Sequence, residues 1–123
     1  MKPLPLDYLA DYVADFYGVK VAELKNKCRS DRLAKPRFVF TYLARRYANT
    51  TYLDIGRFLG GRDHSTTIHG ERCIQDWMKT DLLLNDQIAW LEKGLKEQAE
   101  ARANAFIATW NERAKQHEIA AVA

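Results

Sequence analysis

The sequence predicts an all-α fold, in which a compact helical domain containing a helix-turn-helix is followed by a long C-terminal helix. Three observations support this prediction. Apolar residues recur at three- and four-residue spacing along most of the chain, which is the period of an α-helix. The pair Gly60-Gly61 separates two such segments and permits a sharp turn. A further helical pattern begins at Asn85 and continues to about Gln116.

The chain has 123 residues, which suits one domain large enough to bury a core without disulfides or metals. Its net charge of +3 is modest, but the positive charge is concentrated in one segment. Residues 20–46 hold nine Lys or Arg residues and only two acidic residues. A localised basic segment of this kind indicates a polyanionic partner.

Cysteine usage and hydropathy exclude several classes of protein. Cys28 and Cys73 are too few for a disulfide framework, and no CxxC pair indicates a zinc site. No apolar run approaches membrane-spanning length, and the N-terminus lacks the pattern of a signal peptide. We therefore expect a cytoplasmic protein associated with the nucleoid.

The first helix is expected to start near Pro5, because proline suits a first helical turn, and to end at Gly18. A shorter helical piece follows and reaches about Lys25. The apolar stripe of the first helix has helical spacing and comprises Leu6, Leu9, Val13, Phe16 and Tyr17.

Residues 25–35 show little periodicity and much charge, which predicts a basic loop that exposes Arg29, Arg32 and Lys35. Pro36 is expected to open the next helix, where a missing amide costs little. Arg37 and Arg45 lie outside the apolar stripe of that helix. The stripe consists of aromatic and aliphatic residues, namely Phe38, Tyr42, Leu43 and Tyr47.

A helix-turn-helix is predicted from Thr51 to Lys79. Thr51 can cap a short helix that ends before Gly60-Gly61, and Asp63 can cap a second helix that starts at His64. The residues of the second helix that face the core are expected to be Thr67, Gly70, Ile74, Trp77 and Met78. Those that face away form a wholly polar surface of Ser65, Thr66, His69 and Arg72.

The last helix is expected to begin with Asn85 as its N-cap. If it continues to about Gln116, it is about 45–50 Å long, at about 1.5 Å per residue. That length exceeds the expected diameter of the domain, so its far half must pack on something, fray or pair with another chain. We expect a domain over residues 1–95 and a helical extension over residues 96–123.

Three blocks of the sequence carry a family resemblance. The first is Arg29-Ser30 with Ala34-Lys35-Pro36-Arg37, and the second is Tyr42-Leu43-Ala44 with Ile55-Gly56-Arg57-Phe58. The third and most specific block runs from Gly60-Gly61-Arg62-Asp63-His64 through Ser65 and Thr66 to His69. Over about Leu4 to Leu95, the chain resembles the C-terminal DNA-binding domain, domain IV, of the bacterial replication initiator DnaA.

The resemblance implies an all-α domain that recognises a short asymmetric nonamer, the DnaA box. It implies that Arg29 enters the minor groove, that Arg37 contacts a phosphate, and that Asp63, His64 and Ser65 face base edges in the major groove. The chain departs from the family at Lys35, Phe38 and Ser65, where arginine, glutamine and threonine are usual. The DNA-binding residues expected in total are Lys27, Arg29, Arg32, Lys35, Arg37, Arg45, Arg62, Asp63, His64, Ser65, Thr66 and His69.

The leading prediction is sequence-specific binding of double-stranded DNA at DnaA-box-like sites, which modulates replication initiation. We expect no enzymatic activity and no cofactor, because no GxxxxGK[ST] phosphate loop and no paired nucleophile and base are found. A metal site is not expected, since His64 and His69 do not share a helical face well.

Two alternatives remain open from the sequence. One is a helix-turn-helix transcriptional regulator that dimerises through its C-terminal helix. The other is an adaptor that binds a replication protein rather than DNA. Both give the C-terminal helix a protein partner, either a second copy of the chain or a replication protein.

Overall fold

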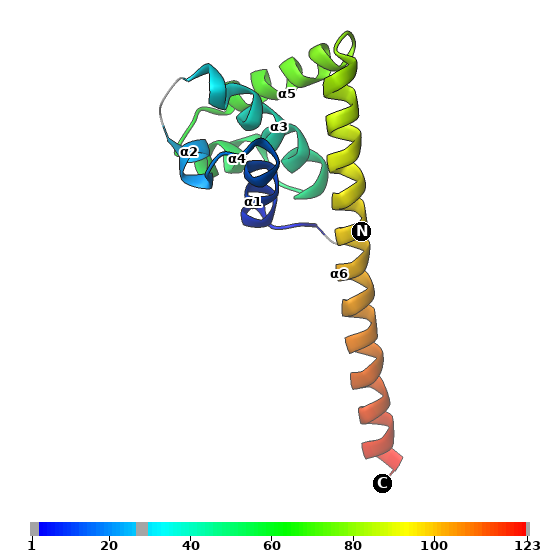
Figure 1. The fold of residues 1–123 in the computed structure, drawn as a ribbon. Coiled ribbons are helices and arrows are strands. Elements are labelled where there is room, and N and C mark those ends of the chain that lie inside the picture. Colours follow the sequence, from blue (N-terminus) through cyan, green and yellow to red (C-terminus); the bar gives the residue numbers. More distant parts are fainter. Residues whose placement is uncertain (1–2, 27–29, 123) are drawn as a thin grey trace.

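The computed structural model describes residues 3–26 and 30–122, and over these residues the chain is helical with no strand. The expected all-α fold with a long C-terminal helix is confirmed (Figure 1). The helices, in chain order, are α1 (Leu6–Tyr17), α2 (Val21–Lys25), α3 (Asp31–Tyr47), α4 (Tyr52–Phe58), α5 (His64–Met78) and α6 (Leu82–Val122).

Helix α3 lies at the centre of the domain and packs against α1, α2, α4, α5 and α6. Its fully buried side chains include Val39, Phe40 and Leu43. The sequence prediction placed Phe38 and Tyr47 in the buried stripe, but both are only partly buried against the core. The buried face is wider than one stripe because helices pack on several sides of α3, which a simple amphipathic pattern does not reveal.

The start of α3 differs from the prediction. The helix begins at Asp31, so Pro36 lies inside it rather than at its first position. A proline there removes one intrahelical hydrogen bond. Burial of Leu33 and Pro36 on the core side offsets this cost. Arg32 and Lys35 therefore lie on the first turns of α3 and not in a basic loop.

The helix-turn-helix has the predicted boundaries and caps. The Thr51 hydroxyl accepts a 3.1 Å hydrogen bond from the Asp54 amide at the start of α4. The turn that follows requires glycine at Gly60, where φ is +92° and a Cβ atom would lie 2.3 Å from the Lys25 carbonyl oxygen. The backbone of the turn thus passes directly against the end of α2.

Helix α5 buries Thr67, Gly70 and Ile74, as the sequence predicts. Trp77 was placed on the same face but is exposed. Its ring lies against that of Phe38 on α3, with the ring centroids 5.8 Å apart.

Helix α6 begins earlier than expected. Asp81 is the capping residue, since its Oδ1 atom accepts a 3.1 Å hydrogen bond from the Leu84 amide. Asn85 was predicted as the cap, but its side-chain amide donates to the Met78 carbonyl inside the α5–α6 corner. The residues of α6 buried against the domain are Leu84, Ile88, Leu91, Leu95 and Ala99.

The C-terminal half of helix α6 extends away from the other helices (Figure 1). Phe106, Ile107 and Trp110 are 57%, 54% and 64% exposed along this part. The expected boundary at residue 95 falls within this continuous helix. Among the residues that the structure describes, no helix is long and apolar enough to cross a membrane.

Candidate nucleic-acid interface

The start of α5 presents a cluster of exposed polar side chains. The Asp63 carboxylate accepts a 3.4 Å hydrogen bond from the Ser65 amide and so caps the helix. It also lies 3.0 Å from His64 Nδ1. The hydrogen bonds from Ser65, with a smaller contribution from His64, lower the pKa of Asp63 below its ordinary value. Thr66 and His69 continue the exposed surface along α5.

The opposite face of α5 holds this cluster in place. The Thr67 hydroxyl is buried, 2.7 Å from the His64 carbonyl oxygen and 3.2 Å from the Tyr52 carbonyl oxygen. It therefore joins the first turn of α5 to the start of α4. At Gly70 an added Cβ atom would lie 2.7 Å from the Phe38 ring, so the absence of a side chain allows α3 to approach closely.

The basic segment at residues 25–35 is anchored, at its start, beside the turn of the helix-turn-helix. The Asn26 carbonyl oxygen accepts a 2.8 Å hydrogen bond from Arg62 and a 2.6 Å hydrogen bond from Arg37. Lys27 and Arg29, which the sequence places in the DNA-binding surface, lie outside the described residues. The chain immediately before them is therefore fixed next to Arg62, at the entrance to α5.

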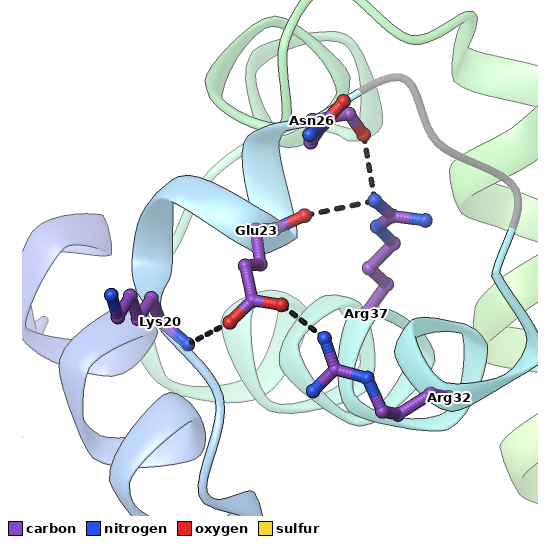
Figure 2. Close-up of polar contacts among 5 residues, drawn as sticks. All are labelled: Lys20, Glu23, Asn26, Arg32 and Arg37. Carbon is purple, nitrogen blue, oxygen red and sulfur yellow. Dashed lines mark hydrogen bonds and ion pairs between the residues drawn. The ribbon is translucent and has the colours of Figure 1, made fainter.

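Arg37 does not occupy the position that the sequence predicts. Its side chain was expected on the surface, in contact with a phosphate, but it is only 5% exposed. Its guanidinium donates hydrogen bonds to the carbonyl oxygens of Glu23 and Asn26 (Figure 2). It also donates a 3.0 Å hydrogen bond to the Leu24 carbonyl oxygen. Arg37 thus donates to carbonyl groups at the end of α2, where a helix leaves carbonyl oxygens without amide partners further along the chain. The Glu23 carbonyl oxygen also accepts a 3.2 Å hydrogen bond from the Asn26 amide.

Arg32 is exposed and forms an ion pair with Glu23 (Figure 2). The Glu23 carboxylate also accepts a 3.1 Å hydrogen bond from the Lys20 amide. The bond from Arg32, and then that from the Lys20 backbone, lower the pKa of Glu23. Lys35 is partly exposed on the same helix. Arg32 and Lys35 thus place positive charge on α3, beside the anchored segment.

Comparison with known proteins identifies the family. A family model described as the bacterial dnaA protein helix-turn-helix matches residues 6–74. The chain belongs to this family.

The curated relatives are chromosomal replication initiator proteins DnaA. The chain is 35% identical to that of Wolbachia pipientis over 95 residues, and 39% identical to that of Geobacter metallireducens over 94 residues. These matches cover 77% and 76% of this chain but only 21% of each relative. The chain therefore spans about a fifth of the length of the DnaA proteins it resembles.

A solved structure supports the same assignment. The crystal structure of a DNA replication initiation factor superposes with a TM-score of 0.68 and 26% sequence identity. The superposition covers 76% of this chain and 29% of the other. The fold of the DnaA C-terminal helix-turn-helix domain is thus present in this chain.

Two departures from the DnaA pattern acquire a structural meaning. Phe38 on α3 stands where the family usually has glutamine. Its ring packs against α5 in an edge-to-face arrangement with the His69 ring, with the ring centroids 6.0 Å apart. It supports α5 through packing rather than through a polar contact. Ser65, in place of threonine, keeps its backbone amide on the Asp63 cap.

Arg45 lies at the end of α3, where its Nη1 atom donates a 2.6 Å hydrogen bond to the Thr50 carbonyl oxygen. Its neighbours Tyr52 and Glu71 were not identified from the sequence, because the three residues come from three different helices. The described residues contain no group of three His, Cys, Asp or Glu side chains that could hold a metal ion.

Proposed function

We propose that this chain binds double-stranded DNA sequence-specifically at DnaA-box-like sites and thereby modulates replication initiation. The observation that carries the proposal is the hydrogen bond from Arg62 to the Asn26 carbonyl. It joins the start of the basic segment to the start of α5, so that one duplex can contact both. Membership of the DnaA helix-turn-helix family and the localised positive charge support the proposal.

In this mechanism the N-terminal end of α5 enters the major groove. His64, Ser65 and Asp63 read base edges there, with Thr66 and His69 beside them. The exposed first turn also carries the positive end of the helix dipole, which favours a nearby phosphate. Asp63 also caps α5, because its carboxylate accepts a hydrogen bond from the Ser65 amide and lies close to His64.

The cationic side chains supply the remaining contacts. Arg29 is proposed to enter the adjacent minor groove, where a narrow groove attracts arginine. Lys27, Arg32, Lys35, Arg45 and Arg62 are proposed to contact phosphates or to place positive charge near them. Such contacts fix the position of the protein without reading sequence, and they make affinity strongly dependent on salt.

A fluorescence anisotropy titration tests the proposal with a DnaA-box duplex and a scrambled duplex of equal length. We expect tighter binding to the box, and we expect His64→Ala to reduce the preference by about 1–3 kcal/mol. Gln75→Ala, an exposed substitution about three turns further along α5, is the matched control and leaves the preference unchanged. Equal affinity of the unmodified chain for both duplexes would overturn sequence-specific binding.

A second candidate function is a transcriptional regulator that dimerises through α6. The exposed Phe106, Ile107 and Trp110 favour it, because they form an apolar surface beyond the domain. A replication protein could occupy the same surface. Sedimentation equilibrium of the full chain separates these cases: a dimer that Trp110→Glu dissociates supports the regulator, whereas a monomer at all concentrations contradicts it.

A further inference from the structure

Glu71 connects three helices at the edge of the proposed DNA-binding surface. It lies on α5, and its side chain is only 17% exposed. Its Oε1 atom accepts a 3.1 Å hydrogen bond from the Tyr52 hydroxyl on α4. Its Oε2 atom is buried without a hydrogen-bond donor in the described part of the chain, and lies 3.8 Å from Arg45 Nε on α3. The charge of Arg45 is thus the nearest compensation for this carboxylate oxygen.

These contacts hold the Arg45 guanidinium in one orientation. Nη1 donates to the Thr50 carbonyl oxygen at 2.6 Å, and the guanidinium carbon lies 4.1 Å from the centre of the Tyr52 ring. A carbonyl, an aromatic face and a carboxylate therefore surround one planar group. The side chain is still 36% exposed, and Nη2 makes no hydrogen bond among the residues described. A planar donor held in this way is preorganised for an anion.

A carboxylate on the helix that is proposed to bind DNA is unfavourable unless it has another role, because its charge repels phosphates. We propose that Glu71 is a positioning residue, which orients Arg45 so that its guanidinium can bind a phosphate of the duplex at the edge of α5. This assignment rests on the proposed DNA-binding function. Glu71 acts only through Arg45 and does not itself contact DNA.

The two effects of Glu71 on DNA binding have opposite signs. If Glu71 only repelled phosphates, Glu71→Gln would remove one negative charge and strengthen DNA binding. If Glu71 positions Arg45, the same substitution weakens DNA binding. The Arg45 side chain then loses a restraint and must be ordered when DNA binds. The direction of the change therefore identifies the role of Glu71.

The experiment measures affinity for a DnaA-box duplex over a series of salt concentrations, for the unmodified chain, Glu71→Gln, Arg45→Ala and the double variant. We expect Glu71→Gln to weaken binding by about three- to tenfold. We expect this loss to vanish in the Arg45→Ala background. Arg45→Ala should also reduce the slope of log affinity against log salt by about 0.9, the effect of one lost phosphate contact.

Asp76→Asn is the matched control. Asp76 is an exposed carboxylate on the same helix, and its only ion pair in the described residues is a surface pair with Lys79 at 3.4 Å. Its removal takes away one negative charge without touching Arg45, so binding stays equal or becomes tighter. If Glu71→Gln fails to fold by circular dichroism, Tyr52→Phe releases only the Oε1 atom, and a smaller loss that again requires Arg45 is expected.

Binding by Glu71→Gln that is as tight as that of the unmodified chain, or an equal loss with and without Arg45, overturns the positioning role and leaves the proposed function standing. An unmodified chain that binds no duplex at low salt overturns the proposed function, and the assignment of Glu71 with it. The two failures are therefore distinguishable.

Discussion

Asn26 and Arg62 are separated by 36 residues in the chain, yet a 2.8 Å hydrogen bond joins the Arg62 Nη2 atom to the Asn26 carbonyl oxygen. The same oxygen accepts a 2.6 Å hydrogen bond from Arg37. One carbonyl thus holds two guanidinium groups, one from α3 and one from the turn between α4 and α5. The end of α2, the centre of the domain and the helix-turn-helix are fixed to one another at this point.

Arg37→Met tests the structural role of the buried arginine. The substitution keeps much of the apolar volume but leaves the carbonyl oxygens of Glu23, Leu24 and Asn26 without this donor. Because charged hydrogen bonds contribute about 1.5–3 kcal/mol each and are not additive, we expect a loss of at least about 3 kcal/mol in the free energy of unfolding. Urea denaturation followed by circular dichroism measures it. Arg32→Gln, which removes an exposed arginine of the same helix, is the control and should be nearly neutral.

Gly60→Ala tests the contact between the turn and α2. Its φ of +92° is unfavourable for alanine, and the added Cβ atom would lie 2.3 Å from the Lys25 carbonyl oxygen. We expect a loss of about 2 kcal/mol or more in thermal or urea unfolding. Gly61→Ala is a matched control, because its φ is +81° but nothing lies within 4 Å of the Cβ position. It should cost only about 1 kcal/mol. Equal costs for the two variants would show that the contact with Lys25 is unimportant.

The helix-turn-helix could be predicted because its signals are local. Thr51 and Asp63 are capping residues, and the hydrogen bonds that they accept come from amides two or three residues away. Gly60 marks a conformation that other residues resist. The exposed surface of α5 followed from helical spacing alone. None of these inferences required knowledge of distant parts of the chain.

The errors arose where contacts between distant residues decide the structure. Arg37 reads as a surface arginine, and only the carbonyl groups of another helix explain its burial. Pro36 reads as a helix start, and only packing against the core explains why α3 begins before it. Tyr52 and Glu71 meet across two helices, a relationship that has no periodic signature in sequence.

The capping role of Asp63 predicts a dependence of stability on pH. The pKa of Asp63 is lowered in the folded chain, so the carboxylate stabilises the fold above its ordinary pKa of 3.8, and this stabilisation is lost as pH falls through the lower folded pKa. Asp63→Asn keeps an oxygen acceptor for the Ser65 amide but cannot titrate. The melting temperature of the unmodified chain should therefore fall relative to that of Asp63→Asn as the solution is acidified below pH 3.8. A constant difference between the two would contradict the capping contribution.

The raised pKa of Tyr17 predicts a second dependence of stability on pH, in alkaline solution. Burial raises its pKa from 10.0 to about 12, and its hydroxyl lies 3.4 Å from Gln87 Oε1 on α6. The unfolded chain ionises first, so the stabilisation is complete below pH 10 and is lost as pH rises from 10 to about 12. Tyr17→Phe should make the alkaline loss of stability less steep, as measured by urea unfolding at increasing pH. The pKa of Tyr47 is also raised to about 12, mainly by burial. Part of the alkaline loss of stability therefore remains in Tyr17→Phe.

Two truncations of α6 test where the domain ends. Ala99 is the last residue whose side chain is described as buried, and Arg102 contacts α1 through the Tyr8 ring, 5.3 Å from its centre. Removal of residues 104–123 should therefore leave the free energy of unfolding almost unchanged. Removal of residues 94–123 also takes away the buried Leu95 and Ala99, and should cost at least about 2–5 kcal/mol, the usual cost of truncating one buried leucine. Differential scanning calorimetry at several protein concentrations compares the three chains. If removal of residues 104–123 caused a large loss of stability that grew with protein concentration, the exposed apolar surface with Phe106 and Trp110 would instead stabilise the chain by self-association.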